Sequence, residues 1–538
     1  ELEQVIAQLC KFQKFHPYEE APFEEEFFIS QLKSRALDLH LQLNSIIEKI
    51  KYKYDFEFIE DHNKIEVQAT DWTCFINRAT KEIEKIQSKL RCKIKMTESD
   101  LLNLVVFRDI TFIIYSVLKR IKIANKLNYF VTIQGYIPSK LESTFKDNFH
   151  EWYHDIKPIR REGDTGVSDI PTLLDNPKFI KTFEDITIAQ GIPKYREIDP
   201  TPLIAFIFPI FYGIMFPDLG QGLILILFGR LLLSPKIKIS NNKRKYRYWS
   251  KMMISFGICS SVIGLLTGTF FGLSFAHYYS NYGILPLFNF KIFEGSHINI
   301  DAVVTIIITA IVIGTFHLAL AYVIAMINKL REQEYAEALM FHFAVLAMYS
   351  FGILFALSFI GSDMDVSQLF TTTNPLPVFS SLLSVNIPSS YAAIVSVPAI
   401  VISLCTIIFG RALISLLSTN STNKFYLSLT QGLTDIAFIP IVFLTNTISY
   451  SRLGIFLIMH SAMMGLVNGA WSYGIAGLPA VILGNIAVMI LEGFLVYIQD
   501  LRLHLYEWLT KFTDDSNTAI LFTPVKSESD LVSIIVCQ

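Results

Sequence analysis

Ionisable and polar side chains interrupt two long apolar segments near the end of the sequence. Arg452 lies in apolar sequence that extends from Ile436 to Met464, and His460 follows it two helical turns later. The next apolar segment contains six more such residues: Glu492, Gln499, Asp500, Arg502, His504 and Glu507. An arginine at the centre of a membrane-spanning helix costs about 2.5–3.5 kcal/mol on insertion scales, so residues of this kind are candidates for a functional role such as moving ions.

Structural explanations compete with a functional one for several of these residues. An internal ion pair between Arg452 and Glu492 would simply join two helices. Arg502 lies near one end of its segment, where its side chain could reach water, and it shares a helix face with Gln499 three residues earlier. Asp435 could lie at the membrane interface, and we expect His317 and His342 to be packed or interfacial rather than ligands.

A separate motif could bind zinc. His150-Glu151-Trp152-Tyr153-His154 matches the H-E-x-x-H pattern, in which two histidines one helical turn apart bind the metal and the glutamate acts as a base. The motif lies in charged and aromatic sequence outside the apolar segments, and no third ligand is evident. We therefore expect surface histidines that bind no metal, and an intramembrane metalloprotease that uses His150 and His154 is a third-ranked alternative.

Sequence motifs for several common activities are absent. No Gly-Lys pair occurs, so the sequence has no P-loop, and neither G-x-G-x-x-G after a strand nor G-x-S-x-G is found. The net charge of −2 gives no basic surface for nucleic acid. The six cysteines have no paired or metal-type spacing, which predicts no disulfide framework.

The charge distribution divides the 538-residue chain into two parts. Residues 1–200 contain 29 of the 46 lysines and arginines and 32 of the 48 aspartates and glutamates, which leaves 17 and 16 for the last 338 residues. The first part therefore has about three times the charge density of the second. This division predicts a soluble domain joined to a membrane domain, and it excludes a soluble single-domain enzyme.

A heptad pattern occurs early in the charged part. Apolar residues alternate in steps of three and four through Ile29, Leu32, Ala36, Leu39, Leu43, Ile46 and Ile50. Helical periodicity continues through Ile83 and Ile86 and again over Ser99–Leu127, whereas Tyr54–Phe75 and Tyr129–Ile137 are typical of strands. We predict long helices paired as an antiparallel coiled coil with small α/β lobes; an ordinary helical core is the alternative.

Apolar segments long enough to cross about 30 Å of hydrocarbon follow one another from Pro200 onward. We predict eight membrane-spanning helices, at about residues 202–216, 219–234, 252–276, 301–327, 336–361, 389–411, 429–469 and 477–509. The first two are short, and the last two are long enough to tilt or to extend beyond the bilayer. Every second connecting loop is basic, and loop 235–251 is the most basic, so we expect this loop and both termini to face the cytoplasm.

Five groups of residues resemble motifs of one protein family, in the same order along the chain. They are Gly135–Pro138; Asn176-Pro177 with Gly191–Tyr195 and Glu197–Thr201; Met215–Gly222; Tyr450–Leu453 within Asn446–His460; and Leu491–Gly493 with Leu501–His504. The family is the large membrane stator subunit of rotary V-type and A-type ATPases, called subunit a or subunit I. The resemblance covers about residues 130–510. Pro217 replaces the usual glycine, and Ser451 and residues 455–459 depart from the usual leucine- and alanine-rich sequence.

The resemblance implies a subunit that moves ions but has no catalytic site of its own. In this family a rotor ring carries one carboxylate per ion site, and two offset half-channels in the stator lead H⁺ or Na⁺ to and from it. Arg452 and Arg502 would be the cations between the half-channels, Gln499 would orient one of them, and Glu492 and His460 would line a half-channel. Further channel or interface positions would be Asp435, His504 and Asp218. No cofactor and no metal are implied.

The resemblance also implies domains and partners. We expect a cytoplasmic α+β arm over 1–198 with an incomplete N-terminus, an all-α membrane domain over 199–510, and a cytoplasmic tail over 511–538. Partners would be the proteolipid rotor ring (subunit c or K), E/G-type peripheral stalk subunits, other ATPase subunits and membrane lipid, without nucleic acid. The length favours a multi-pass protein of a prokaryotic cell membrane. A stand-alone secondary transporter or channel is the alternative, although no inverted repeat is evident and the arm is large for one.

Overall fold

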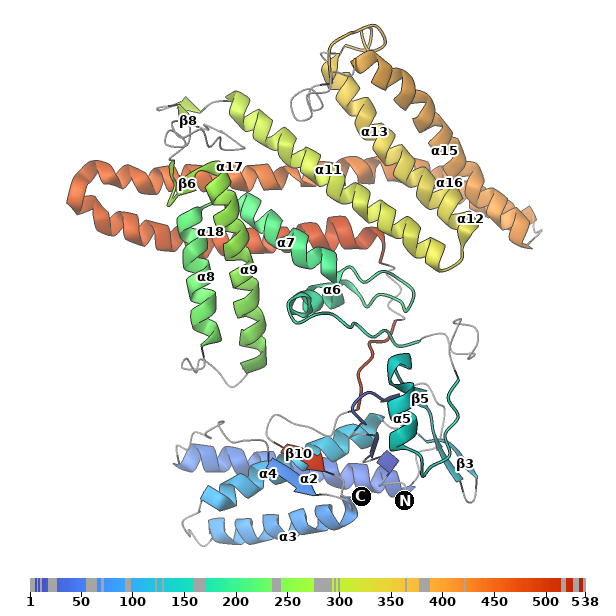
Figure 1. Cartoon of the computed structure of the whole chain (residues 1–538), viewed down its shortest axis with the longest axis vertical. Helices are drawn as coiled ribbons and strands as arrows, with labels where there is room; N and C mark the ends of the chain where they lie inside the picture. The colour runs from blue at the N-terminus through green and yellow to red at the C-terminus, as the bar shows by residue number, and fades with distance from the viewer. Residues whose placement is uncertain are drawn as a thin grey trace. The chain divides into compact units, whose positions relative to one another are not determined.

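The computed structural model describes residues 5–6, 8–9, 12–17, 27–54, 65–68, 72–91, 98–120, 123–127, 130–157, 170–234, 243–274, 293–294, 297–298, 300–362, 365–376, 388–419, 422–513, 519–525 and 532–535 (Figure 1). The chain forms two compact units, one of Glu1–Leu173 with Ile520–Gln538 and one of Leu174–Ala519. Most of the regular structure in both units is helical.

Three helices build the main core of the first unit: α2 (Phe27–Tyr54), α3 (Trp72–Arg91) and α4 (Glu98–Arg120). Each of the three packs against the other two. The core contains the heptad positions Leu32, Ala36, Leu39, Leu43 and Ile46 of α2 together with Ile83 and Ile86 of α3. The predicted periodicity therefore marks the buried faces of these helices. Because three helices share one core, a paired coiled coil stays a prediction.

The first unit also contains short strand pairs. β1 (His16–Pro17) pairs antiparallel with β5 (Gly135–Tyr136), and β3 (Ile123–Leu127) pairs antiparallel with β4 (Phe130–Ile133). The 3-10 helix η1 (Ser139–Leu141) and helix α5 (Glu142–Asn148) follow. Strands thus form where Tyr129–Ile137 predicted them.

The second predicted strand region differs from the structure. Within Tyr54–Phe75 the described strand is β2 (Ile65–Gln68), and helix α3 has already begun at Trp72. Residues 55–64 and 69–71 lie outside the described residues. The alternation of β-formers therefore did not reveal the start of α3, whose first side chain, Trp72, is buried in the helical core.

The end of the chain returns to the first unit. β10 (Val532–Ile535) pairs in parallel with β2, and Thr172 and Leu521 form an isolated parallel bridge. The carbonyl oxygen of Thr523 lies 3.1 Å from Nδ1 of His16 and also accepts a hydrogen bond from Arg120. Residues that follow the membrane segments thereby complete a domain that begins at the other end of the sequence.

The second unit is built from helices with a few two-residue strands. The 3-10 helix η3 (Ile180–Phe183) and α6 (Glu184–Gln190) precede a series of apolar helices. That series is α7 (Thr201–Met215), α8 (Leu219–Leu233), α9 (Lys243–Thr267), α11 (Ile300–Arg331), α12 (Tyr335–Glu337), the π-helix η4 (Ala338–His342), α13 (Phe343–Gly361), α15 (Ser389–Thr419), α16 (Thr422–Ser449), α17 (Ser451–Gly469), the 3-10 segment η5 (Ala470–Gly477), α18 (Leu478–Arg502), the π-helix η6 (Leu503–Trp508) and the 3-10 helix η7 (Leu509–Lys511). The strands are β6 (Thr269–Phe270) with β7 (Leu273–Ser274), and β8 (Phe293–Glu294) with β9 (His297–Ile298).

Close pairs of helices organise this unit (Figure 1). α8 and α9 lie side by side, and a Cβ added at Gly222 of α8 would lie only 2.5 Å from Oγ of Ser261 in α9. The missing side chain thus allows the two backbones to approach. α15 packs against both α13 and α16, and α17 and α18 run alongside each other as a long hairpin. Pairs of this kind place the polar residues of one helix against those of its neighbour.

Five helical stretches of the described chain are long and apolar enough to cross a membrane: Arg247–Thr267, Val303–Arg331, Tyr335–Gly361, Ser389–Gly410 and Leu429–Lys511. Two shorter apolar helices are α7 and α8. The last stretch contains 83 residues and includes both α17 and α18. These helices identify a membrane protein. Each predicted segment contains a helix, but eight separate crossings stay a prediction.

Candidate functional site

The α17–α18 hairpin carries most of the candidate residues. Its connection, η5, contains Gly474 with a φ of 64°, a left-handed conformation that glycine adopts without strain. α17 begins at Ser451, directly after a break at Tyr450 that separates it from α16. α17 also packs against α7 and α11. Arg452 is therefore placed at the start of a helix that is held by three neighbours.

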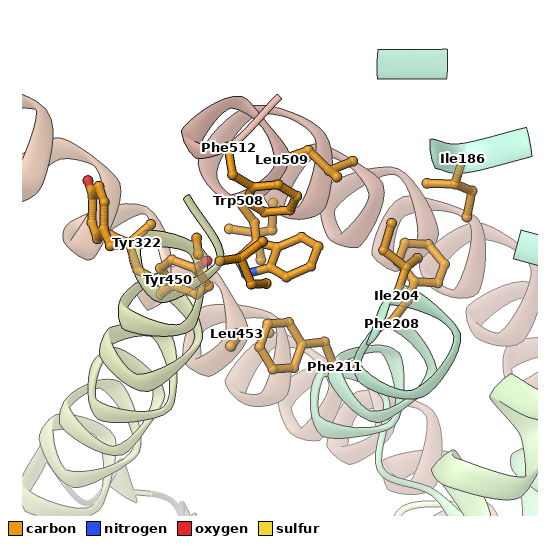
Figure 2. Close-up of a cluster of buried hydrophobic side chains, with 14 of the residues drawn as sticks. Ile186, Ile204, Phe208, Phe211, Tyr322, Tyr450, Leu453, Trp508, Leu509 and Phe512 are labelled. Carbon is orange, nitrogen blue, oxygen red and sulfur yellow. The ribbon is translucent and has the colours of Figure 1, made fainter. Parts of the chain in front are cut away.

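Tyr450 fixes the break between α16 and α17. Its side chain is completely buried, and its ring occupies the place where a Cβ on Gly314 of α11 would otherwise be. The Tyr450 hydroxyl lies 2.9 Å from Nδ1 of His317. Figure 2 shows Tyr450 in an apolar cluster with Leu453, Phe211 and Trp508. This packing determines where α17 starts and hence where Arg452 lies.

Arg452 is held by a glutamate from the end of the hairpin's second helix. Nη1 of Arg452 donates a hydrogen bond to Oε1 of Glu507 at 3.1 Å, and Nη2 donates to Oγ of Ser449 at 3.3 Å. The side chain of Arg452 is 22% exposed, whereas that of Glu507 is 7% exposed. The alternative that Arg452 pairs with Glu492 is wrong, because the structure gives Arg452 a different carboxylate and Glu492 a different partner.

A π-helix brings Glu507 to this position. α18 changes at Leu503 into η6, whose wider turns bury four residues: Leu503, His504, Glu507 and Trp508. π-turns of this kind are rare and frequently occur at functional sites. Nε1 of Trp508 donates to the carbonyl oxygen of His317 at 3.1 Å. The imidazole of His317 stacks on the indole, with ring centroids 5.0 Å apart and planes 9° apart.

Two buried carboxylate–histidine pairs lie along α18. Nδ1 of His460 in α17 is 3.0 Å from Oε2 of Glu492, and both side chains are almost completely buried. The rings of His460 and Phe216 pack at a steep angle, with centroids 4.8 Å apart and planes 61° apart. The second pair joins the end of α18 to η6: Nδ1 of His504 lies 3.0 Å from the backbone carbonyl oxygen of Asp500 and 3.1 Å from its Oδ1.

The buried histidines and carboxylates keep unused hydrogen-bonding capacity. Among the described residues, seven atoms of the histidines and carboxylates around the hairpin have no hydrogen-bond partner: Nε2 of His317, His460 and His504, Oε1 of Glu492, both carboxylate oxygens of Asp500 and Oε2 of Glu507. Buried polar groups are normally satisfied, so unused atoms of this kind call for a role such as exchanging a proton. A histidine beside a carboxylate is well suited to accept and release one.

Asp218 has a structural part in the membrane unit. Its completely buried side chain is the N-cap of α8, where Oδ1 accepts from the backbone N–H of Gln221 at 2.9 Å. Oδ1 also accepts from the N–H of Phe271 at 3.0 Å, and Oδ2 accepts from that of Gly272 at 2.7 Å. Asp218 therefore ties the loop after β6 to the start of α8, and its channel role stays a prediction.

The remaining candidates lie apart from these pairs. Arg502 is exposed, while Gln499 and Asp435 are half-buried. Gln499 therefore shares the helix with Arg502, as the spacing predicts, but no hydrogen bond joins it to either arginine among the described residues. His317 is packed against Trp508, as the sequence suggested, and His342 is half-buried.

The H-E-x-x-H motif does not form the helical geometry of a zinc site. α5 ends at Asn148, and His150 lies in the turn that follows it. Nδ1 of His150 is 3.1 Å from the carbonyl oxygen of Asp147, and Nδ1 of His154 is 3.0 Å from that of Trp152. Within the described residues, no group of three or more potential ligands could hold a metal ion.

Three residues at the centre of the structural site were given no site role from the sequence: Glu507, Tyr450 and His317. Glu507 appeared in the sequence only as one of several polar residues in the last apolar segment. Its importance follows from its contact with Arg452, 55 positions away. The signal that could have found it is its own insertion cost, since a buried glutamate in apolar sequence requires a partner.

Comparisons with known proteins identify the family. The model of the V-type ATPase 116kDa subunit family matches residues 4–292. An A-type ATP synthase subunit I of Saccharolobus solfataricus is 26% identical over 477 residues, which cover 81% of this chain and 66% of that protein. The subunit I of Aeropyrum pernix is 24% identical over 395 residues, which cover 70% of this chain and 54% of that protein. The chain thus spans about half to two thirds of the length of these relatives.

A helical membrane unit with buried ionisable pairs, joined to a charged helical unit, defines a membrane protein with an attached polar domain. The family match covers more than half of the chain, so the protein belongs to the V-type ATPase 116kDa subunit family. This confirms the family that the sequence motifs indicated.

Proposed function

We propose that this chain is the non-catalytic, ion-translocating stator subunit of a rotary A/V-type ATPase. Family membership and relatives whose printed name is A-type ATP synthase subunit I support this role. The observation that carries it is the state of Arg452: the guanidinium lies in an apolar helical segment, is 22% exposed, and has a single buried carboxylate as ion-pair partner among the described residues. A cation so placed can meet a carboxylate on another chain.

In the proposed mechanism, Arg452 separates two half-channels that lead to the rotor carboxylates. Each rotor carboxylate that reaches Arg452 must release its H⁺ or Na⁺ before it pairs with the guanidinium. Arginine is suited to this because it stays charged and its planar fork can engage a carboxylate twice. Moving one charge across 100 mV corresponds to about 2.3 kcal/mol, which is the scale of the force that drives or opposes rotation.

The buried pairs would supply the route to one side of Arg452. His460 and Glu492 lie 3.0 Å apart and each keeps an atom without a hydrogen-bond partner among the described residues. Asp500 and His504 form a second pair. Asp500 lies on α18, as Glu492 does, and His504 lies in η6, which directly follows α18. Successive groups of this kind could pass a proton or bind water along a half-channel.

An exposed face of α18 fits a helical partner. Ile490, Phe494 and Ile498 are exposed and recur every four residues, and exposed Arg502 continues the same face. Ile455, three residues after Arg452 on α17, is also exposed. We propose that these apolar faces contact the rotor helices, with Arg502 as a second cation and Gln499 beside it. The charged first unit would hold peripheral stalk subunits.

Purification from the native membrane tests the proposal. A stator subunit is expected to copurify, after mild detergent extraction, with a small proteolipid that carries a carboxylate in mid-membrane and with stalk subunits. Mass spectrometry of the purified sample identifies them. A stand-alone transporter would be purified without a proteolipid, and a metalloprotease would contain zinc that is lost in a His154→Ala variant; either result would contradict the proposal.

A further inference from the structure

We infer that Glu507 is a positioning residue that holds Arg452 when no rotor carboxylate lies opposite it, an inference that rests on the proposed function. Oε1 of Glu507 accepts from Nη1 of Arg452 at 3.1 Å. The glutamate is 7% exposed and the arginine 22%. The arginine is therefore the member of the pair that can meet another chain, whereas the glutamate stays inside the unit.

The contact with Glu507 leaves some guanidinium N–H donors of Arg452 without an acceptor among the described residues. A guanidinium has five N–H donors in one plane. Within the described residues Nη1 donates to Glu507 and Nη2 donates to Oγ of Ser449, and Oε2 of Glu507 has no hydrogen-bond partner. The pair is therefore not bidentate, and a carboxylate from another chain can engage the N–H groups that remain.

Glu507 is fixed more firmly than Arg452. Trp508, the next residue, is completely buried, donates to the carbonyl oxygen of His317 at 3.1 Å and stacks on the imidazole of His317. His317 is in turn 2.9 Å from the hydroxyl of Tyr450, two residues before Arg452. One set of contacts thus fixes both the π-helix that carries Glu507 and the helix break that places Arg452.

Within the described residues, the other carboxylates near the hairpin lie within ion-pair distance of histidines rather than of Arg452. Glu492 lies beside His460, and Asp500 lies beside His504. Glu507 is therefore the carboxylate of this site that offsets the charge of Arg452. When a rotor carboxylate arrives, Glu507 competes with it for the same cation. This competition weakens the pair between Arg452 and the rotor carboxylate, so the transported ion can displace Arg452 more easily.

The test separates this role from a merely structural one by measuring how pumping depends on the transported cation. In assembled complexes carrying Glu507→Gln, the apparent KM for the cation is expected to rise at least about fivefold, because Arg452 then binds the rotor carboxylate without competition. The maximal rate at saturating cation is expected to be largely kept. Glu507→Asp keeps the charge and should give an intermediate KM. Glu334→Gln, which removes an exposed carboxylate elsewhere in the membrane unit, should leave the KM unchanged.

A lower maximal rate with an unchanged KM in Glu507→Gln would show a structural role and overturn the inference, as would wild-type values of both the maximal rate and the KM.

A second measurement is independent of pumping. Arg452→Ala leaves Glu507 as a buried carboxylate without its cation, so the thermal unfolding temperature of the complex should fall, and adding Glu507→Gln should restore much of it. Absence of that rescue would also refute the inference. Normal pumping by Arg452→Ala would instead contradict the proposed function, so the two failures are distinguishable.

Discussion

Replacing Arg452 with alanine is expected to abolish ATP-driven ion transport in complexes that still assemble. The guanidinium lies in an apolar helical segment, where an arginine costs about 2.5–3.5 kcal/mol on insertion scales and is therefore a candidate for a functional role. Glu507 is its ion-pair partner, but the arginine stays 22% exposed. Without the cation, rotor carboxylates have no group that forces them to release their ion, so rotation and transport lose their coupling.

Lysine at this position provides the control for charge. Arg452→Lys is expected to remain severely impaired, because a lysine loses the planar fork and deprotonates readily when desolvated. If Arg452 only joins helices through Glu507, lysine should instead restore most of the function. The comparison thereby separates the functional role from internal pairing.

Transport is measured as ion uptake into vesicles and normalised to assembled complex. Arg452→Ala leaves Glu507 as a buried charge without its cation, which can impair assembly. The double variant with Glu507→Gln removes this charge and is measured as well, so that a loss of transport is not confused with a loss of assembly. Normal pumping by an assembled Arg452→Ala complex would remove the basis for a rotary stator.

The second large effect is expected at the His460–Glu492 pair. Glu492→Gln and His460→Gln should each lower the transport rate by about 100-fold if the pair carries protons, since positioned acid–base groups contribute on this scale. Nδ1 of His460 and Oε2 of Glu492 are 3.0 Å apart, so the two side chains should act as one unit. The double variant is then expected to be little worse than either single variant.

Initial rates of uptake at several pH values check this expectation. Asp365→Asn is the matched control, because it neutralises an exposed carboxylate in a loop and should leave the rate unchanged. If the double variant loses transport by the product of the two single-variant losses, Glu492 and His460 act independently and do not share one role in proton transfer. An unchanged transport rate in Glu492→Gln would exclude that role.

The sequence predicted those features that depend on local patterns. The heptad spacing from Leu32 to Ile46 marked the buried face of α2, because a helix with apolar residues on one side must bury that side. Apolar segment length located the membrane helices, since a hydrocarbon layer requires long runs without charge. The motifs around Arg452 and Glu492 indicated the family, which the family comparison confirms.

Features that depend on packing between distant segments could not be predicted. Arg452 and Glu507 are 55 positions apart, and their contact requires both the α17–α18 hairpin and the π-turn that moves Glu507 to the buried side. Neither a one-residue helix break nor a π-turn has a clear sequence signal. β10 pairs in parallel with β2 from the opposite end of the chain, and no periodicity reveals such a pairing. The H-E-x-x-H pattern also could not reveal that α5 ends before His150.

The most direct test of the central claim is a disulfide between α17 and the rotor. Ile455 is exposed and lies three residues after Arg452, on nearly the same helix face. With the native cysteines replaced, a cysteine at Ile455 and one beside the rotor carboxylate are expected to cross-link, and the cross-link should stop ATP-driven transport until it is reduced. Ile402 on α15, which is also exposed, provides the matched position and should not cross-link. Cross-linking at Ile402 but not at Ile455 would contradict the proposal that Arg452 faces the rotor.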